Sequence, residues 1–276
     1  MCRWVAYSGA PVRLEDLLFT PENSLVIQSQ HSRLGATTTN GDGFGVGWYG
    51  AEETPGVFRS AEPAWNDRNL RELSALAHSR RVFAHIRAST GSPVQQTNCH
   101  PFRHGSRLWM HNGALMGFPT MKRDLAFAVD PALFSEIEGS TDSEMLFFLA
   151  LTFGLEDDPP TAVARAVGLV EQIAQRHGIP EPVQMTVATT DGDTTWAFRY
   201  SSAHASRSLF HSADVSTLRD QYPDNPVLQE LSGDARLVVS EPLGDLQGAW
   251  REVPESCCVI VHGAEEELRP FAPTAP

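Results

Sequence analysis

The clearest alternation of apolar and polar positions lies in residues 82–88. In an extended chain, Phe83, His85 and Arg87 share one face, and the small apolar residues between them share the other. Other short apolar stretches bounded by turn-forming residues also predict strands. These are residues 4–8, 44–49, 56–59, 107–111, 183–189, 194–200, 237–240 and 257–261.

Helical periodicity is strongest in residues 141–153 and 160–177, and shorter helices are predicted at 14–19, 24–30 and 69–78, with Asn66 or Asp67 as the cap of the last. The glycine- and threonine-rich residues 35–43 predict a loop. Because strands occupy both ends of the chain with helices between them, the pattern favours an α+β fold over regular βαβ alternation. We expect one domain over residues 1–276, with residues 265–276 as a solvated tail.

Composition narrows the possible functions. The chain has a net charge of −13, which repels phosphate backbones and makes nucleic acid a poor partner. It has no run of about 18 apolar residues, so no membrane span is expected. No apolar signal segment begins the chain, and its four cysteines form no CxxC pair, which together indicate a reduced, cytoplasmic setting.

Cys2 is the first candidate for chemistry. Removal of Met1 would make Cys2 N-terminal, so that one residue carries both a thiol and a free α-amine. The ordinary pKa values of these groups, about 8.5 and 7.7–8.0, allow the amine to accept the thiol proton and later protonate a leaving amine. Arg3 adds positive charge that favours the thiolate. The alternative is that Cys2 is incidental.

Two polar motifs lie at or just after the ends of predicted strands. Arg87, with Thr90 three residues later, could bind a carboxylate, although Arg87 could instead pair with a surface acid. Asn112 and Gly113 could form an oxyanion hole from a side-chain amide and a backbone N–H. Alone, Asn-Gly is a strong turn signal, and the turn is then the simpler interpretation.

The segment Thr141-Asp142-Ser143-Glu144 opens the predicted long helix. Thr141 and Glu144 fit a capping box, in which the side chain of each residue accepts a hydrogen bond from the backbone N–H of the other. This role leaves Asp142 available to bind a substrate ammonium group.

Three further patterns are set aside. Cys99 and His100 are neighbours, and adjacent side chains rarely face one site. The glycines of residues 45–50 match GxGxxG without the strand-then-helix context of a dinucleotide site, so they indicate close backbone packing or strand kinks. His100, His104 and His111 lack a carboxylate or further ligand at supportive spacing, so neither a metal nor a cofactor is expected.

In combination, Cys2, Arg87 with Thr90, Asn112-Gly113 and Asp142 resemble the glutaminase site of class II glutamine amidotransferases. This resemblance implies the N-terminal nucleophile fold, an αββα sandwich of two antiparallel sheets between helical layers. It also implies that Cys2 is the nucleophile, that Asn112 and Gly113 form the oxyanion hole, that Arg87 and Thr90 bind the α-carboxylate, and that Asp142 binds the α-ammonium of a γ-glutamyl substrate.

Longer stretches are similar to a stand-alone, YafJ-like subgroup of that family. The stretches are residues 40–46, 63–66, 97–102, 139–144 and 240–243. The subgroup includes the amidase subunit of the eukaryotic glutathione-degradation complex and the ergothioneine-pathway γ-glutamyl amidohydrolase. The resemblance therefore implies hydrolysis of a γ-glutamyl amide through a Cys2 thioester, with release of glutamate.

Two alternatives remain open at the level of sequence. Ala88 and Gly91 stand where ammonia-channelling members commonly have Trp and His, which counts against ammonia transfer. A glutaminase subunit that delivers ammonia to a separate protein partner is nevertheless one alternative. The other is a non-catalytic binding or scaffold subunit, which would retain Met1 or a blocked N-terminus.

Overall fold

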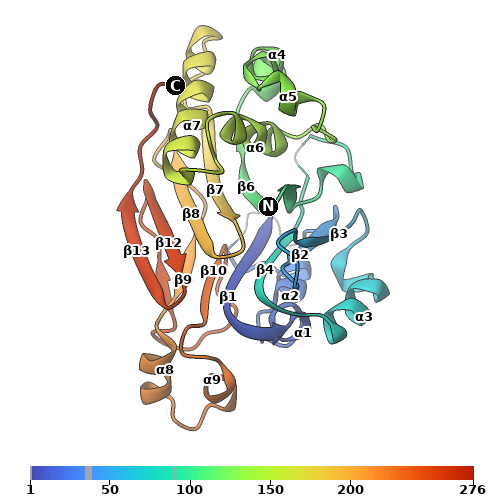
Figure 1. Ribbon diagram of the computed structural model, residues 1–276, viewed down its shortest axis with the longest axis vertical. Helices are drawn as coiled ribbons and strands as arrows, with labels where there is room; N and C mark the ends of the chain where they lie inside the picture. The colour runs from blue at the N-terminus through green and yellow to red at the C-terminus, as the bar shows by residue number, and fades with distance from the viewer. Residues whose placement is uncertain (1, 35–38, 90) are drawn as a thin grey trace.

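The computed structural model describes residues 2–34, 39–89 and 91–276, and two antiparallel sheets packed face to face form its centre (Figure 1). The first sheet contains β1 (Arg3–Arg13), β2 (Phe44–Trp48), β3 (Gly56–Ser60), β4 (His78–Ile86), β9 (Phe210–Ser212), β10 (Arg236–Val239) and β11 (Trp250–Glu252). Its order is β11-β9-β10-β1-β4-β2-β3. The second contains β5 (Phe102–His104), β6 (Arg107–Leu115), β7 (Val183–Thr190), β8 (Thr194–Ser201), β12 (Cys257–His262) and β13 (Glu265–Pro270). Its order is β13-β12-β8-β7-β6-β5.

Helices cover the outer face of each sheet. The first sheet is covered by α1 (Leu14–Leu18), α2 (Leu25–Gln30) and α3 (Arg68–Leu76). The second is covered by α4 (Phe118–Ala128), α5 (Pro131–Phe134), α6 (Asp142–Thr152) and α7 (Pro159–Arg176). The short helices α8 (Val215–Gln221) and α9 (Pro226–Glu230) form the projection at the lower end of Figure 1. The predicted αββα sandwich is therefore confirmed.

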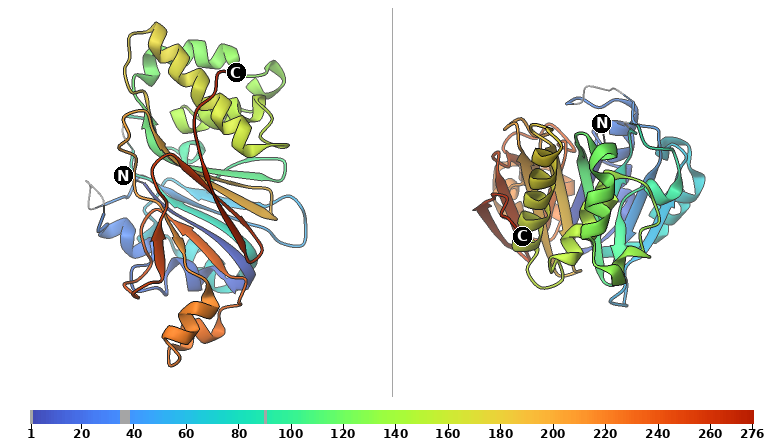
Figure 2. Two further views of the ribbon diagram at one scale, coloured as in Figure 1. Left: turned by 90° about the vertical axis from the view of Figure 1, so that its left-hand side faces the viewer. Right: turned by 90° about the horizontal axis from the view of Figure 1, so that it is seen from above.

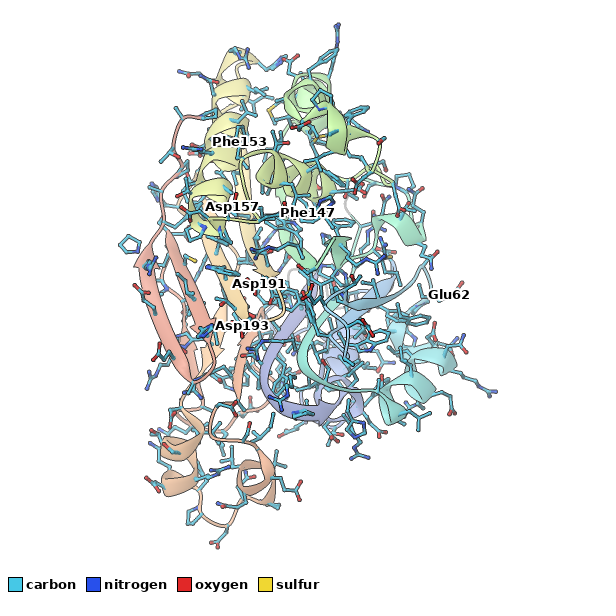
Figure 3. The ribbon with its side chains drawn as sticks, viewed as in Figure 1. Glu62, Phe147, Phe153, Asp157, Asp191 and Asp193 are labelled. Carbon is cyan, nitrogen blue, oxygen red and sulfur yellow. The ribbon has the colours of Figure 1, made fainter. Side chains whose placement is uncertain are left out.

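The alternation in β4 shows why the sheets stack in this way. Phe83 packs between the two sheets with Trp4 and Met110, whereas Val82 and Ile86 face the helices outside the first sheet. A strand that is buried on both faces must be covered on both, which forces a layered arrangement. On the opposite side, residues 145–151 of α6 are all apolar, and Phe147, labelled in Figure 3, is completely buried.

The largest boundary difference is in β6. The predicted strand 107–111 continues to Leu115, so Asn112 and Gly113 lie inside a strand, paired with Thr186 and Met185, and the turn interpretation is wrong. A side chain on Gly113 would come within 1.9 Å of the Gln184 carbonyl oxygen, so only glycine fits this close pairing.

The C-terminal segment also differs from expectation. Residues 265–270, expected to be solvated tail, form the edge strand β13, which pairs along β12. The chain then runs up to α7, where Phe271 packs against Phe198 and the Thr274 N–H donates to Ala164 O (Figure 2). The side chains of β13 are exposed, so polarity indicated solvent contact correctly but could not reveal the backbone pairing.

Antiparallel pairing brings several chain segments to the same end of the strands of the first sheet. Cys2 precedes β1, and the two strands beside β1, which are β4 and β10, both finish at that end. Arg87 therefore lies on one side of Cys2 and residues 240–241 on the other. The strand β9, which lies on the other side of β10 from β1, begins at the same end.

Candidate active site

The Cys2 sulfur lies against the backbone of Ala88, 3.5 Å from its nitrogen and 3.6 Å from its oxygen. Burial raises the pKa of the Cys2 thiol, while the Ala88 N–H and the charges of Arg87 and Arg3 oppose that rise. Because the net direction is upward, the resting thiol is protonated at neutral pH and needs a base to become a nucleophile.

A buried ion pair fixes the chain immediately after Cys2. Arg3 Nε donates to Glu241 at 2.9 Å, and another Arg3 nitrogen donates to the Cys2 carbonyl at 2.8 Å. Glu241 also accepts hydrogen bonds from Asn23 Nδ2 and from the backbone N–H of Arg33. The sequence showed residues 240–243 only as a point of resemblance; their structural role is to hold the strand that carries Cys2.

Arg87 is 3% exposed and is held by neutral oxygens. It donates to the Asp42 carbonyl at 3.2 Å and to Ser92 Oγ at 2.7 Å, and no carboxylate pairs with it in the described part of the chain. Its charge is therefore positioned but not neutralised, as a carboxylate-binding residue requires. Thr90, expected to assist Arg87, lies outside the described residues.

Asn112 is connected across the sheet interface to Trp4, two residues after Cys2. The Trp4 indole donates to Thr186 Oγ1 at 3.3 Å, and that hydroxyl donates to the Asn112 carbonyl at 3.4 Å. Asn112 is only 2% exposed, yet its side-chain amide makes no hydrogen bond with any residue that the structure describes. An amide that forms no hydrogen bond with a described residue can donate to a ligand oxygen.

Asp142 joins the start of α6 to the end of β6. One of its oxygens accepts from the Leu115 N–H and the other from the Ser143 N–H, both at 2.8 Å. Carboxylate oxygens can accept more than one hydrogen bond, so this orientation leaves capacity for an ammonium group. The carboxylate thus lies at the end of the strand that contains Asn112 and Gly113.

The predicted capping box is only half formed. Thr141 Oγ1 accepts from the Glu144 N–H at 3.1 Å, as expected. Glu144 instead accepts from the N–H groups of Glu138 and Gly139. Asn98 accepts from the Ser140 N–H at 2.9 Å, so two of the family-like stretches brace each other beside Asp142.

The other candidate nucleophile is poorly placed. Cys99 is fully buried, its sulfur donates to the Ser60 carbonyl, and burial raises its pKa to about 11. Both ring nitrogens of His100 lack a hydrogen-bond partner in the described part of the chain, so the two residues form no catalytic pair. Burial also lowers the pKa of His85 to about 3, which keeps that ring neutral near the site.

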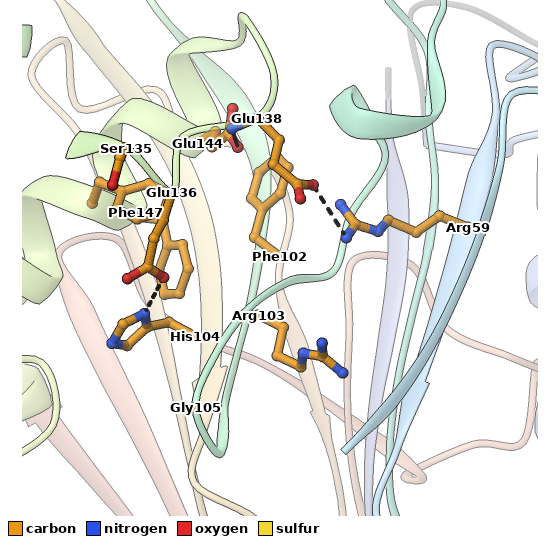
Figure 4. A pocket seen from close by; sticks show the side chains of 11 residues that line it. Arg59, Phe102, Arg103, His104, Gly105, Ser135, Glu136, Glu138, Glu144 and Phe147 are labelled. Atoms are coloured by element: carbon orange, nitrogen blue, oxygen red, sulfur yellow. Dashed lines mark hydrogen bonds and ion pairs between the residues drawn. The ribbon is translucent and has the colours of Figure 1, made fainter. Parts of the chain in front are cut away.

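A separate hollow of about 320 Å³ lies beside α6 (Figure 4). Its charged groups largely satisfy one another, since His104 pairs with Glu136 at 2.9 Å and Arg59 approaches Glu138 at 3.8 Å. It contains neither Cys2 nor Arg87. We therefore place the candidate centre at Cys2.

Comparison with known proteins gives an independent view of this arrangement. Residues 20–268 match the family model described as class II glutamine amidotransferases. A Saccharomyces cerevisiae protein named probable glutamine amidotransferase DUG3 is 33% identical, over 98% of this chain and 84% of its own length. The γ-glutamyl-hercynylcysteine sulfoxide hydrolase of Mycolicibacterium smegmatis is 29% identical, over 98% of this chain and 100% of its own length.

Solved structures agree on the fold. A protein from Silicibacter pomeroyi described as a glutamine aminotransferase class-II domain protein superposes with a TM-score of 0.75 at 32% identity, covering 99% of this chain and 100% of that one. The Bacillus subtilis glutamine phosphoribosylpyrophosphate amidotransferase superposes with a TM-score of 0.63 at 15% identity, covering 99% of this chain and 50% of that one.

Among the described helices, none has the length and apolar character needed to cross a bilayer.

Proposed function

Because this chain belongs to the class II glutamine amidotransferases and is an amidohydrolase of that family, we propose that it hydrolyses a γ-glutamyl amide through a Cys2 thioester and releases glutamate. The similarity to a mycobacterial hydrolase named for a γ-glutamyl substrate supports this substrate class. The observation that carries the proposal is the contact of the Cys2 sulfur with Ala88, next to the unneutralised Arg87.

The first half of the reaction breaks the amide. After removal of Met1, the Cys2 α-amine accepts the thiol proton, and the sulfur bonds to the γ-carbonyl carbon. The Asn112 amide and the Gly113 N–H stabilise the resulting oxyanion. The C–N bond then breaks, and the ammonium of Cys2 returns its proton to the leaving amine.

The second half restores the enzyme. Water attacks the thioester carbon and gives a proton to the Cys2 α-amine. A C–O bond forms and the C–S bond breaks, so glutamate leaves and the thiolate regains its proton. In this scheme Arg87 binds the α-carboxylate and Asp142 the α-ammonium, which holds the γ-carbonyl against the sulfur.

The test compares three versions of one amide: γ-glutamyl, N-acetyl-γ-glutamyl and α-glutamyl. Asp142 binds only a free ammonium, and an α-glutamyl compound places its carbonyl at a different distance from the groups that Arg87 and Asp142 bind. Only the γ-glutamyl compound should therefore be hydrolysed efficiently. Similar kcat/KM for all three would refute the proposed head-group recognition. Arg87→Lys should raise KM and lower kcat, because an ammonium cannot make the two parallel bonds of a guanidinium.

A further inference from the structure

A second hollow opens on the side of Cys2 away from Arg87. It has a volume of about 410 Å³ and lies where β9 begins and β11 ends, so that Arg3, Arg199, Arg207 and Glu252 line it. None of these residues belongs to the candidate machinery for the glutamyl head group. The hollow therefore needs an explanation of its own.

The positive charges of this hollow are unequally balanced. Arg3 pairs with Glu241, and Arg199 pairs with Glu252 at 2.6 Å. Arg207 has no ion pair or hydrogen bond with any residue described by the structure, and its Nε is buried without a partner. A buried guanidinium nitrogen without an acceptor is costly, and a ligand carboxylate would relieve that cost.

Arg207 is also electrostatically coupled to the nucleophile. Burial lowers the pKa of Arg207, the charge of Arg3 lowers it further, and Cys2 opposes the change. The order β9-β10-β1-β4 places Arg207, before β9, and Arg87, after β4, on opposite sides of Cys2. A substrate that crosses Cys2 with its head group at Arg87 would extend its other end toward Arg207.

We propose that this hollow binds the leaving amine and that Arg207 pairs with a carboxylate on it. The preferred substrates are then γ-glutamyl amino acids or γ-glutamyl peptides, in which the leaving group is itself an amino acid or peptide, rather than glutamine, whose leaving group is ammonia. This inference rests on the proposed function and specifies its substrate class.

The experiment uses γ-glutamyl-alanine and γ-glutamyl-alaninamide, which differ only in the charge of the leaving group. Because a charge-assisted hydrogen bond is at stake, kcat/KM should favour γ-glutamyl-alanine by about 10- to 100-fold in the wild-type enzyme. Arg207→Gln should bring the ratio of the two values close to one. Arg207→Lys should retain part of the preference, since it keeps the charge without the guanidinium geometry.

Arg251→Gln is the matched control, because Arg251 is exposed on β11 beside the hollow but does not line it. It changes net charge equally and should keep the wild-type ratio. A general folding defect would lower both rates by the same factor and would not change their ratio. An Arg207→Gln variant that keeps the wild-type ratio would therefore overturn the inference. So would equal rates for the two substrates in the wild-type enzyme, although glutamate release would then still support the proposed function. Absence of glutamate release from both substrates and from glutamine would overturn both.

Discussion

Arg3 and Glu241 form a buried ion pair at 2.9 Å although 238 positions separate them in the chain. Both side chains are at most 2% exposed, and Arg3 also holds the carbonyl of Cys2. The end of β10 thereby fixes the start of β1. The position of the nucleophile depends on a contact between opposite ends of the sequence.

Glu241→Gln should lower the free energy of unfolding by about 3–5 kcal/mol, because it leaves the buried Arg3 guanidinium without its counter-charge. It should also lower kcat, since the segment that carries Cys2 loses its anchor. Asp245→Asn is the control: it removes the exposed pair with Arg33 and should cost less than about 1 kcal/mol. Denaturant unfolding measures both values, and equal values would show that the buried pair has no special role.

The same pair predicts a dependence of stability on pH. Burial raises the pKa of Glu241, but hydrogen bonds from Arg33, Asn23 and Leu34 and the charge of Arg3 lower it more, so the net shift is downward. Its stabilisation is therefore complete above the ordinary glutamate pKa of about 4.3 and is lost as pH falls toward the lowered value. Unfolding curves measured from about pH 6 to about pH 3 should show that the free energy of unfolding falls less steeply with pH in Glu241→Gln than in the wild type.

Cys2→Ala should abolish turnover, whereas Cys99→Ala, Cys257→Ala and Cys258→Ala should retain it. Cys99 and Cys258 are buried, and burial raises the pKa of Cys99 to about 11, so neither presents a reactive thiolate. Intact-mass measurement after treatment with a glutamine-like diazoketone should show one label on Cys2 and no initiator methionine. Labelling of Cys99, or full activity with Met1 retained, would contradict this assignment.

Asn112→Ala should lower kcat by about 10²–10³-fold with a smaller effect on KM, because an oxyanion donor acts mainly in the transition state. The amide makes no hydrogen bond to a described residue, so its removal should disturb the fold little. Steady-state kinetics with a γ-glutamyl amide measures this. A raised KM at unchanged kcat would instead indicate that Asn112 contributes only to ground-state binding.

The acidic limb of the pH profile should report the Cys2 α-amine. That amine acts as base only when unprotonated, so kcat/KM should rise with pH through a value near about 7.7–8.0. His85 is an unsuitable source of the limb, because burial lowers its pKa to about 3. Cys2→Ser should keep the midpoint at a much lower rate; a midpoint that moves with the nucleophile would assign the limb to the thiol.

The sequence alone determined the layered fold and the identities of the candidate site residues. Strand and helix periodicity indicated a sandwich of sheets and helices, and the order of Cys2, Arg87, Asn112 and Asp142 matched a family pattern. Local periodicity and residue chemistry are properties of short segments, so they can be read without knowing where the segments meet.

Tertiary structure decided what each segment faces. Asn-Gly, a turn signal in isolation, lies inside β6 because pairing with β7 outweighs local preference. Residues 265–270 look like tail but complete a sheet through backbone hydrogen bonds, which side-chain polarity does not encode. Glu241 and Arg207 carried no local signal of their roles. Their significance arises only because strand order brings distant segments to Cys2, where buried charge must find a partner from elsewhere in the chain or from a ligand.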